Sequence, residues 1–293
     1  MPRPLMENFK AIEGIVSDID GVWFQGNMIE KGAPALMEEI HRRKWKMMFA
    51  SNGSGGRRAV VEKFAKAGID VAEDNVRTAG HAVALYLQGE KQRLKKNMHV
   101  LFLGPAELEE ECASLGVDAL LKQEHVWDPK EKKWIGEKRK EPSHVVVARH
   151  DYNQGTVEAA AAALRRGAKW IATGADHAVT TDTEDLRAGT GTLVAAIQSM
   201  IASYSKSKEP EIQGKPNPAF IQGCLTQMQS DPGKTAMLGD SVDTDMEVAK
   251  ILRMRRWLVW SGVTKTLEYS QYSSDYDHAY ADIGALAEIL RAA

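Results

Sequence analysis

Cysteine is scarce in this chain of 293 residues: only Cys112 and Cys224 occur, and they do not form a CxxC pair. A disulfide framework or a cysteine zinc site is therefore not expected, and a reducing compartment fits this composition. Long apolar runs are also missing, since none approaches the ~18 residues that a membrane-spanning helix needs. The first residues lack the apolar stretch of a signal peptide, and Glu7 stands where a transit peptide avoids acid. These absences predict a cytoplasmic protein with no membrane partner.

An excess of one charge is missing too. The 38 basic and 40 acidic side chains leave a formal net charge of −2. Without a positive field, no general attraction to nucleic acid is expected. The segment 127–142 (WDPKEKKWIGEKRKEP) is densely charged and could be read as a nucleic-acid patch. Because it interleaves both signs and sums to nearly zero, we predict a solvated hairpin or loop and no nucleic-acid partner.

What the chain does contain is a repeated alternation of short apolar runs with helical patterns. This alternation predicts a parallel sheet covered by helices, an α/β fold. The predicted strands are residues 14–17, 46–50, 98–103, 144–148, 169–173, 235–239 and 256–260. The predicted helices are residues 33–43, 57–67, 105–115, 156–166 and 243–252. The polar segment 203–218 has the composition of a linker and predicts a domain junction.

Acidic residues follow two of these strands. Asp18 and Asp20 come directly after the first strand, and Asp240 and Asp245 follow a late one. Carboxylates this close repel one another unless a cation neutralises them or one is protonated. Taken alone, the first pair could equally be a turn or a helix cap, and Asp243 could simply cap the next helix. Two acidic clusters on adjacent strands would instead form a hard oxygen site suited to Mg²⁺.

A polar loop, SNGSGG, follows the second predicted strand at residues 51–56. Ser51, Asn52 and Gly53 offer a hydroxyl and backbone N–H groups at a helix start, which is a cradle for an anion. The loop lacks the GK[ST] of a Walker motif, and flexible turns look similar. Lys215, in GKPNP, would by itself be an ordinary surface lysine. In a parallel sheet, however, such loops gather at the carboxyl edge, where ligands bind.

In this order and on these elements, the four signals resemble the haloacid dehalogenase superfamily. The matching segments are SDIDGVWFQG, FASNGSG, GKPNP and MLGDSVDTDM. The long stretch before GKPNP resembles the large α/β cap of the phosphoglycolate, pyridoxal phosphate and 4-nitrophenyl phosphate phosphatases, down to WIATGADHAVTTDTEDLRAGTGTL. The resemblance implies a doubly wound parallel-sheet (Rossmann-like) core at residues 1–88 and 209–293. An inserted α/β cap domain would occupy residues 89–208.

The resemblance implies a Mg²⁺-dependent phosphatase of small phosphomonoesters. Asp18 would be the nucleophile that forms an aspartyl phosphate, and Asp20 the general acid and base. The side chains of Asp18 and Asp240, with the backbone carbonyl of Asp20, would hold Mg²⁺. Asp245 would orient a metal-bound water.

The remaining site residues follow from the same resemblance. Ser51, the backbone around Asn52 and Gly53, and Lys215 would bind the phosphoryl oxygens. The resemblance also suggests a small phosphomonoester as substrate and a homodimer formed through the cap. A retired or regulatory phosphoester-binding protein of the same fold is the alternative. The acid at Asp20 counts against it, because a binding-only site has no use for that group.

Departures from the family pattern lie in the cap. The usual asparagine of the cap loop is Gly174 here, whereas the loop aspartate is kept as Asp176. Pyridoxal phosphate phosphatases carry a histidine three residues past that aspartate, where this chain has Val179, and His177 stands at another offset. These differences favour phosphoglycolate or a broad range of small phosphoesters, with pyridoxal phosphate as the alternative. We predict that Asp176 and His177, on a loop spanning 174–181, contact the leaving group and set specificity.

Overall fold

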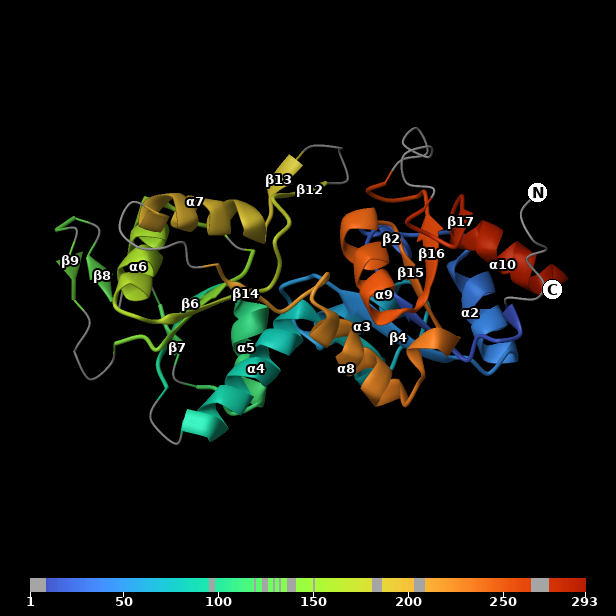
Figure 1. Cartoon of the computed structure of the whole chain (residues 1–293), viewed down its shortest axis with the longest axis horizontal. Coiled ribbons are helices and arrows are strands. Elements are labelled where there is room, and N and C mark those ends of the chain that lie inside the picture. Colours follow the sequence, from blue (N-terminus) through green and yellow to red (C-terminus); the bar gives the residue numbers. More distant parts are fainter. Residues whose placement is uncertain are drawn as a thin grey trace. The chain divides into compact units, whose positions relative to one another are not determined.

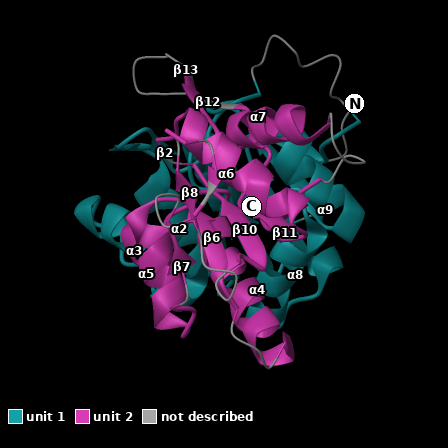
Figure 2. Cartoon of the chain, turned by 90° about the vertical axis from the view of Figure 1, so that its left-hand side faces the viewer, with its two compact units in different colours: residues 1–51, 60–77, 215–293 teal, residues 52–59, 78–214 magenta. Residues whose placement is uncertain are grey.

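The computed structural model describes residues 9–94, 98–118, 120–122, 126–128, 130–131, 133–135, 141–149, 151–180, 186–202, 209–264 and 274–293 (Figure 1). The chain divides into two compact units (Figure 2). The first, here the core unit, comprises residues 1–51, 60–77 and 215–293, and the second, here the cap unit, comprises residues 52–59 and 78–214. Each is built on its own sheet, which confirms the predicted α/β fold with a second α/β domain. The sequence-based domain boundaries given above remain a proposal.

The core unit contains a six-stranded sheet in the order β17-β16-β15-β1-β4-β5. Its strands are β1 (Gly14–Ser17), β4 (Lys46–Ser51), β5 (Val76–Thr78), β15 (Thr235–Gly239), β16 (Arg255–Val259) and β17 (His278–Tyr280). The central strand β1 runs parallel to both neighbours, and its Ser17 pairs with Leu238 of β15 and Phe49 of β4. The two strands that are followed by aspartates are therefore adjacent, which is the arrangement that a shared oxygen site requires.

Helices cover both faces of the core sheet. They are α2 (Ala33–Arg42), α3 (Arg57–Lys66), α8 (Pro218–Met228), α9 (Glu247–Leu252) and α10 (Ile283–Ala292). On one face, Leu36 of α2, Phe64 of α3 and Leu290 of α10 belong to a single buried cluster with the sheet. Helices α8 and α9 pack on the other face, against β1, β4 and β16. The predicted helix at 243–252 begins as a π-helical turn, η5 (Val242–Met246), and continues as α9.

Smaller elements complete the core unit. Strands β2 (Phe24–Gln25) and β3 (Met28–Ile29) form a hairpin directly after the Asp18–Gly21 segment. Two 3₁₀ turns, η1 (Glu73–Asn75) and η4 (Pro232–Lys234), precede β5 and β15. Helix α3 ends where Gly68 adopts φ of 78°, the conformation expected of the glycine after a helix.

The cap unit contains a five-stranded parallel sheet in the order β14-β11-β10-β6-β7. Its strands are β6 (Val100–Leu103), β7 (Leu120–Leu121), β10 (His144–Val147), β11 (Lys169–Ala172) and β14 (Glu211–Ile212). Its helices are α4 (Ala79–Leu94), α5 (Ala106–Ser114), α6 (Gln154–Arg165) and α7 (Thr190–Ala202). Alternate strand residues face opposite layers: Val145 packs with α6 and α7, and Val146 packs with α4 and α5. The two pairs of helices lie on opposite sides of the cap sheet (Figure 1).

Two predicted loops contain strands. In the charged segment 127–142, β8 (Trp127–Asp128) and β9 (Lys133–Trp134) pair as an antiparallel hairpin, which confirms the hairpin alternative. In the linker-like segment 203–218, the strand β14 joins the edge of the cap sheet, while residues 203–208 lie outside the described part. Among the described residues, no helix combines the length and the hydropathy that crossing a bilayer requires.

Candidate active site

The carboxyl ends of β1 and β15 bring three carboxylates together. Asp18, Asp240 and Asp245 each offer one oxygen that lies within 4.8 Å of the other two. The ammonium of Lys215 is 2.7 Å from an oxygen of Asp18 and 2.7 Å from one of Asp245. Lys215, Asp240 and Asp245 are buried, and the side chain of Asp18 is 14% exposed. The structure thus assembles four residues that the sequence places up to 227 positions apart.

Three glycines make room for these carboxylates. A Cβ atom at Gly21 would lie 2.2 Å from an oxygen of Asp240, and one at Gly262 would lie 1.8 Å from it. A Cβ at Gly239 would lie 2.3 Å from the carboxyl carbon of Asp245. Gly21 also has φ of 83°, which disfavours any side chain. The close approach of backbone to carboxylate therefore requires glycine at all three positions.

Asp245 organises its neighbours through both carboxylate oxygens. Its Oδ2 accepts hydrogen bonds from the backbone N–H groups of Asp240 and Ser241, each at 3.2 Å. Its Oδ1 accepts one from the ammonium of Lys215. The carboxylate of Asp240 accepts a further bond from the N–H of Val263 at 2.7 Å. Since protein donors engage both oxygens of Asp245, this residue holds Asp240 and Lys215 in place.

The charges in this cluster are unbalanced. Burial and, to a smaller extent, the charge of Asp245 raise the pKa of Asp240 to about 6. Burial also raises the pKa of Asp18 well above its usual value, in spite of the nearby Lys215. For Lys215, burial alone would lower the pKa, but Asp18 and Asp245 raise it. Three carboxylates thus face one protonated lysine, and hard oxygen donors with excess negative charge suit a divalent cation such as Mg²⁺.

Asp20 points elsewhere. Its side chain is 65% exposed and forms an ion pair with Lys63 of α3 at 2.7 Å. The Lys63 ammonium also lies 4.4 Å from the centre of the Phe24 ring. The structure therefore does not bring the Asp20 carboxylate into the cluster, while Ser51, at the end of β4, is buried beside β1. Sequence reasoning missed Lys63, because a lysine within an amphipathic helix carries no signal of its partner.

A second missed contribution comes from Trp23. Its indole N–H donates to the hydroxyl of Ser17 at 2.7 Å, and that hydroxyl donates to the backbone carbonyl of Asp18 at 2.8 Å. The ring is fully buried against Phe49 and Phe64. Trp23 thus supports the backbone that presents Asp18.

The remaining predicted site residues belong to the cap unit. The amide of Asn52 donates to the carboxylate of Asp176 at 3.3 Å, and the carbonyl of Gly53 accepts from the N–H of Gly80 at 3.2 Å. Asp176 is half-buried, whereas His177 is exposed. The structure therefore brings Asn52 and Asp176 together, although the sequence reasoning assigned them to different tasks.

The predicted loop at 174–181 is shorter than expected. Residues Ala178–Thr180 form strand β12, which pairs with β13 (Leu186–Ala188), and Thr181 lies outside the described residues. The carbonyl of Asp176 accepts from Gly191 N–H at 2.9 Å, and that of His177 accepts from Gly189 N–H at 2.8 Å. Neighbouring backbone therefore fixes Asp176 and His177.

Comparison with known proteins places this architecture in a family. A haloacid dehalogenase-like hydrolase model matches residues 15–118, and a HAD-hydrolase-like model matches residues 212–286, together more than half of the chain. The chain belongs to the haloacid dehalogenase-like hydrolases. The family resemblance inferred from the sequence is confirmed, and the protein is a phosphatase of this family.

The similar proteins share nearly the whole chain. The sugar-phosphatase AraL of Bacillus subtilis is 28% identical over 94% of this chain and 93% of its own. Phosphoglycolate phosphatase 1A of Arabidopsis thaliana is 27% identical over 87% of this chain and 70% of its own. The solved structure of a glycerol phosphate phosphatase from Mycobacterium tuberculosis, in complex with magnesium, has a TM-score of 0.76 at 22% identity. It covers 97% of this chain and 79% of its own.

Proposed function

We propose that this phosphatase hydrolyses small phosphomonoesters through an aspartyl phosphate on Asp18, with Mg²⁺ as cofactor. The observation that carries the proposal is the buried cluster of Asp18, Asp240 and Asp245 around Lys215. A nucleophilic carboxylate beside a fixed cation is the arrangement that attack on a phosphoryl group requires.

The chemistry of the donor set fits Mg²⁺. The side chains of Asp18 and Asp240, with the backbone carbonyl of Asp20, would hold the ion. Burial and the neighbouring carboxylates raise the pKa values of both side chains, and a bound cation would oppose that effect. When bound, Mg²⁺ supplies charge neutralisation to the carboxylates and to the phosphoryl group. Asp245, which accepts a hydrogen bond from Lys215, would not bind the ion directly but would orient a metal-bound water.

The chain's own residues supply the bond changes. An oxygen of Asp18 attacks phosphorus, the bond from phosphorus to the leaving oxygen breaks, and Asp20 gives that oxygen its proton. Asp20 then removes a proton from water, whose oxygen attacks the aspartyl phosphate, releasing phosphate and restoring Asp18. Ser51 and Lys215 bind the phosphoryl oxygens throughout. The Asp20 carboxyl must leave Lys63 to reach the leaving oxygen, because the ion pair holds it outside the cluster around Asp18.

For the substrate, we propose phosphoglycolate or a similar small phosphoester. Val179 stands where pyridoxal phosphate phosphatases carry a histidine, and relatives named for sugar phosphates and phosphoglycolate are consistent with a small, polar leaving group. Pyridoxal phosphate is the alternative. Within the cap loop, the sequence predicts Asp176 and His177 as the specificity residues, and we propose the exposed His177 as the one that meets the leaving group. We also propose that the chain forms a homodimer through the cap. Sedimentation velocity would test this.

Phosphate release across a substrate panel tests the function. The panel contains phosphoglycolate, glycerol 3-phosphate, sugar phosphates, nucleoside monophosphates, pyridoxal phosphate and 4-nitrophenyl phosphate. We expect release that requires Mg²⁺, stops with EDTA and has its highest kcat/KM on phosphoglycolate. Highest kcat/KM on pyridoxal phosphate would select the alternative substrate. Absence of Mg²⁺-dependent release on the whole panel would contradict the proposal.

The role of Asp20 has its own test. Asp20→Asn removes the proton donor, so turnover of phosphoglycolate should fall by about a hundredfold or more. Turnover of 4-nitrophenyl phosphate should fall much less, because 4-nitrophenolate leaves without protonation. The measurement is kcat on both substrates with saturating Mg²⁺. Equal losses on both would mean that Asp20 supports the structure rather than the proton transfer.

A further inference from the structure

The polar loop that follows Ser51 is packed inside the cap unit. The carbonyl of Gly53 accepts from the N–H of Gly80, and the carbonyl of Gly55 accepts from the hydroxyl of Thr78 at 2.8 Å. A Cβ at Gly80 would lie 2.5 Å from the carbonyl oxygen of Ser54, so this approach requires glycine. The loop that carries proposed phosphate contacts is therefore built against α4.

Three buried hydroxyls tie the same loop to the cap sheet. The hydroxyl of Ser54 lies 3.2 Å from that of Thr173, which lies 3.2 Å from that of Thr190. The Ser54 oxygen also accepts the backbone N–H of Arg149 at 3.1 Å. The three hydroxyl residues are between 0% and 6% exposed. This chain joins the loop, the carboxyl end of β11 and the start of α7 through groups that would be costly to leave unbonded.

Asp176 completes the arrangement at the end of the loop nearest Ser51. Its carboxylate accepts from the amide of Asn52, and its own backbone is fixed by Gly191. The other end of the same amide faces Gly214. A Cβ at Gly214 would lie 2.6 Å from the side-chain carbonyl oxygen of Asn52. Asn52 is thus seated between the Asp176 carboxylate and the Gly214 backbone.

Asn52 and Gly214 are each joined along the chain to a residue of the proposed phosphate site. Asn52 follows Ser51 along the chain, and Gly214 precedes Lys215. A rotated Asn52 amide would place its NH₂ group against Gly214 and its oxygen against the Asp176 carboxylate. That repulsion makes one orientation of the amide much the better. The carboxylate of Asp176 therefore sets the orientation of Asn52.

We propose that Asp176 is a positioning residue for the phosphate-binding loop: it orients Asn52 and so holds the segment joined to Ser51. This inference rests on the proposed function, which assigns phosphate binding to Ser51 and Lys215. It differs from a role in specificity, because a positioning residue affects every substrate alike. Contacts with the leaving group, which set specificity, then come from other residues of the cap loop.

A double-mutant cycle on inorganic phosphate tests the proposal. Binding of phosphate to the full chain is measured by calorimetry with saturating Mg²⁺, which requires no turnover. Asp176→Ala and Asn52→Ala should each weaken phosphate binding by about tenfold to a hundredfold, the range for hydrogen bonds to charged groups. The double variant should bind no more weakly than the weaker single variant, since both remove one interaction. Asp176→Asn keeps an acceptor for the Asn52 amide and should recover most of the affinity.

Controls separate positioning from general stability. Asp118→Ala removes an exposed carboxylate of the same unit, whose side chain is 79% exposed, and should change neither Tm nor phosphate affinity. Losses that multiply in the double variant would overturn the proposal, as would unchanged phosphate affinity in Asp176→Ala. Failure of the wild type to bind phosphate would overturn it too. Phosphate binding without Mg²⁺-dependent turnover on any substrate would instead overturn the proposed function and leave the cycle interpretable.

Discussion

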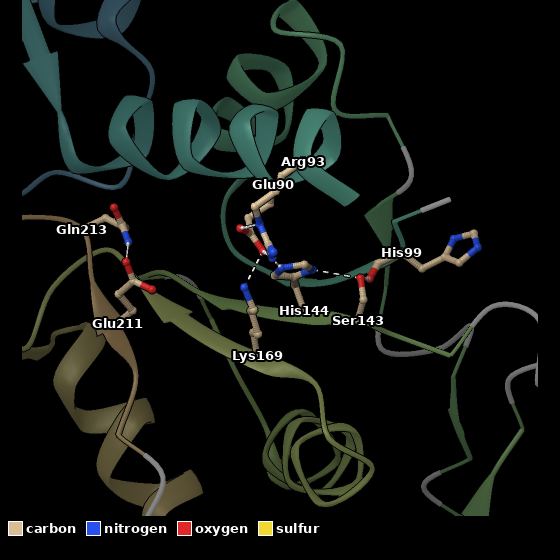
Figure 3. A network of polar contacts seen from close by, with 8 residues as sticks. All are labelled: Glu90, Arg93, His99, Ser143, His144, Lys169, Glu211 and Gln213. Atoms are coloured by element: carbon tan, nitrogen blue, oxygen red, sulfur yellow. Dashed lines mark hydrogen bonds and ion pairs between the residues drawn. The ribbon is translucent and has the colours of Figure 1, made fainter. Parts of the chain in front are cut away.

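The molecule contains two charged clusters of opposite character, one in each unit. In the core unit, three carboxylates surround the ammonium of Lys215 at the carboxyl ends of strands. In the cap unit, the single carboxylate of Glu90 meets Arg93 at 2.8 Å, Lys169 at 2.5 Å and His144 at 3.3 Å (Figure 3). His144 and Lys169 are the first residues of β10 and β11, so this cluster lies at the amino ends of strands.

The pKa shifts separate the two clusters. Hydrogen bonds from Arg93, and also from Lys169 and His144, lower the pKa of Glu90 against the effect of its burial. Burial raises the pKa of Asp18 in spite of Lys215. The cluster around Glu90 is therefore satisfied by the protein itself and holds α4 to the cap sheet. The cluster around Asp18 has three carboxylates for one lysine, and the proposed Mg²⁺ would supply the missing positive charge.

Asp18→Asn should produce the largest effect. Turnover should fall by about a thousandfold or more, because an amide is a poor nucleophile and a weaker metal ligand. Without metal, however, the variant should unfold at the same Tm as the wild type or a higher one. The raised pKa of Asp18 means that its ionised form disfavours the folded state at neutral pH. Retained turnover would contradict the role of Asp18 as nucleophile. A clearly lower Tm in EDTA would mean that Asp18, like Glu90, stabilises the fold.

The same acid-to-amide change at Glu90 should act in the opposite way. Glu90→Gln leaves Arg93, Lys169 and His144 without their counter-charge and should lower the unfolding free energy by about 2–4 kcal/mol. The effect should be present above pH ~4.5 and shrink as pH falls below it, because the folded-state pKa of Glu90 is lowered. The value of kcat should change little. Denaturant unfolding between pH 3.5 and 7 provides the measurement.

A surface carboxylate serves as the control for Glu90. The side chain of Glu131 is 64% exposed and lies 3.7 Å from Lys133. Glu131→Gln should change the unfolding free energy by no more than about 0.5 kcal/mol. Equal effects of the two substitutions would mean that the Glu90 cluster contributes no more than an exposed pair.

A smaller effect is expected for the pH dependence of Mg²⁺ binding at the Asp18 cluster. The pKa of Asp240 is raised from 3.8 to about 6 in the folded protein. The folded state therefore binds more protons than the unfolded state between these values, so stability without metal falls as pH rises through this window. Mg²⁺ needs the ionised carboxylates, and its stabilisation should grow as pH rises through about 6. Thermal melts with Mg²⁺ or EDTA at pH 5 and 7.5 test this, and a larger Mg²⁺ effect at pH 5 would contradict it.

The smallest expected effect concerns Lys63. Its pair with Asp20 is exposed, so it contributes at most about 1 kcal/mol. Lys63→Gln should release the Asp20 carboxyl and raise kcat on phosphoglycolate by up to about threefold, with little change on 4-nitrophenyl phosphate. Lys63→Arg, which preserves the pair, should behave as the wild type. A fall in kcat on both substrates would mean that Lys63 supports the site instead of restraining Asp20.

Local patterns were sufficient to predict much of this molecule. The strand at 14–17 is β1 itself, and the helix predicted at 33–43 is α2 to within one residue. Apolar alternation and helical spacing are properties of neighbouring residues, so they can be read without the fold. The same alternation predicted that the loops after β1 and β15 lie at one edge of the sheet, because parallel strands share their carboxyl edge, whereas the pairing of these two strands came from the fold.

Sequence alone therefore determined the α/β class, the family and the set of acidic residues that end the strands, since each is written in short segments. Tertiary structure decided which side chains from distant segments come into contact. The burial of Lys215 between two carboxylates, the diversion of Asp20 to Lys63 and the contact of Asn52 with Asp176 join residues 30 to 197 positions apart. Such contacts depend on which side chains the folded backbone brings within hydrogen-bonding distance. Neither spacing nor composition carries that information.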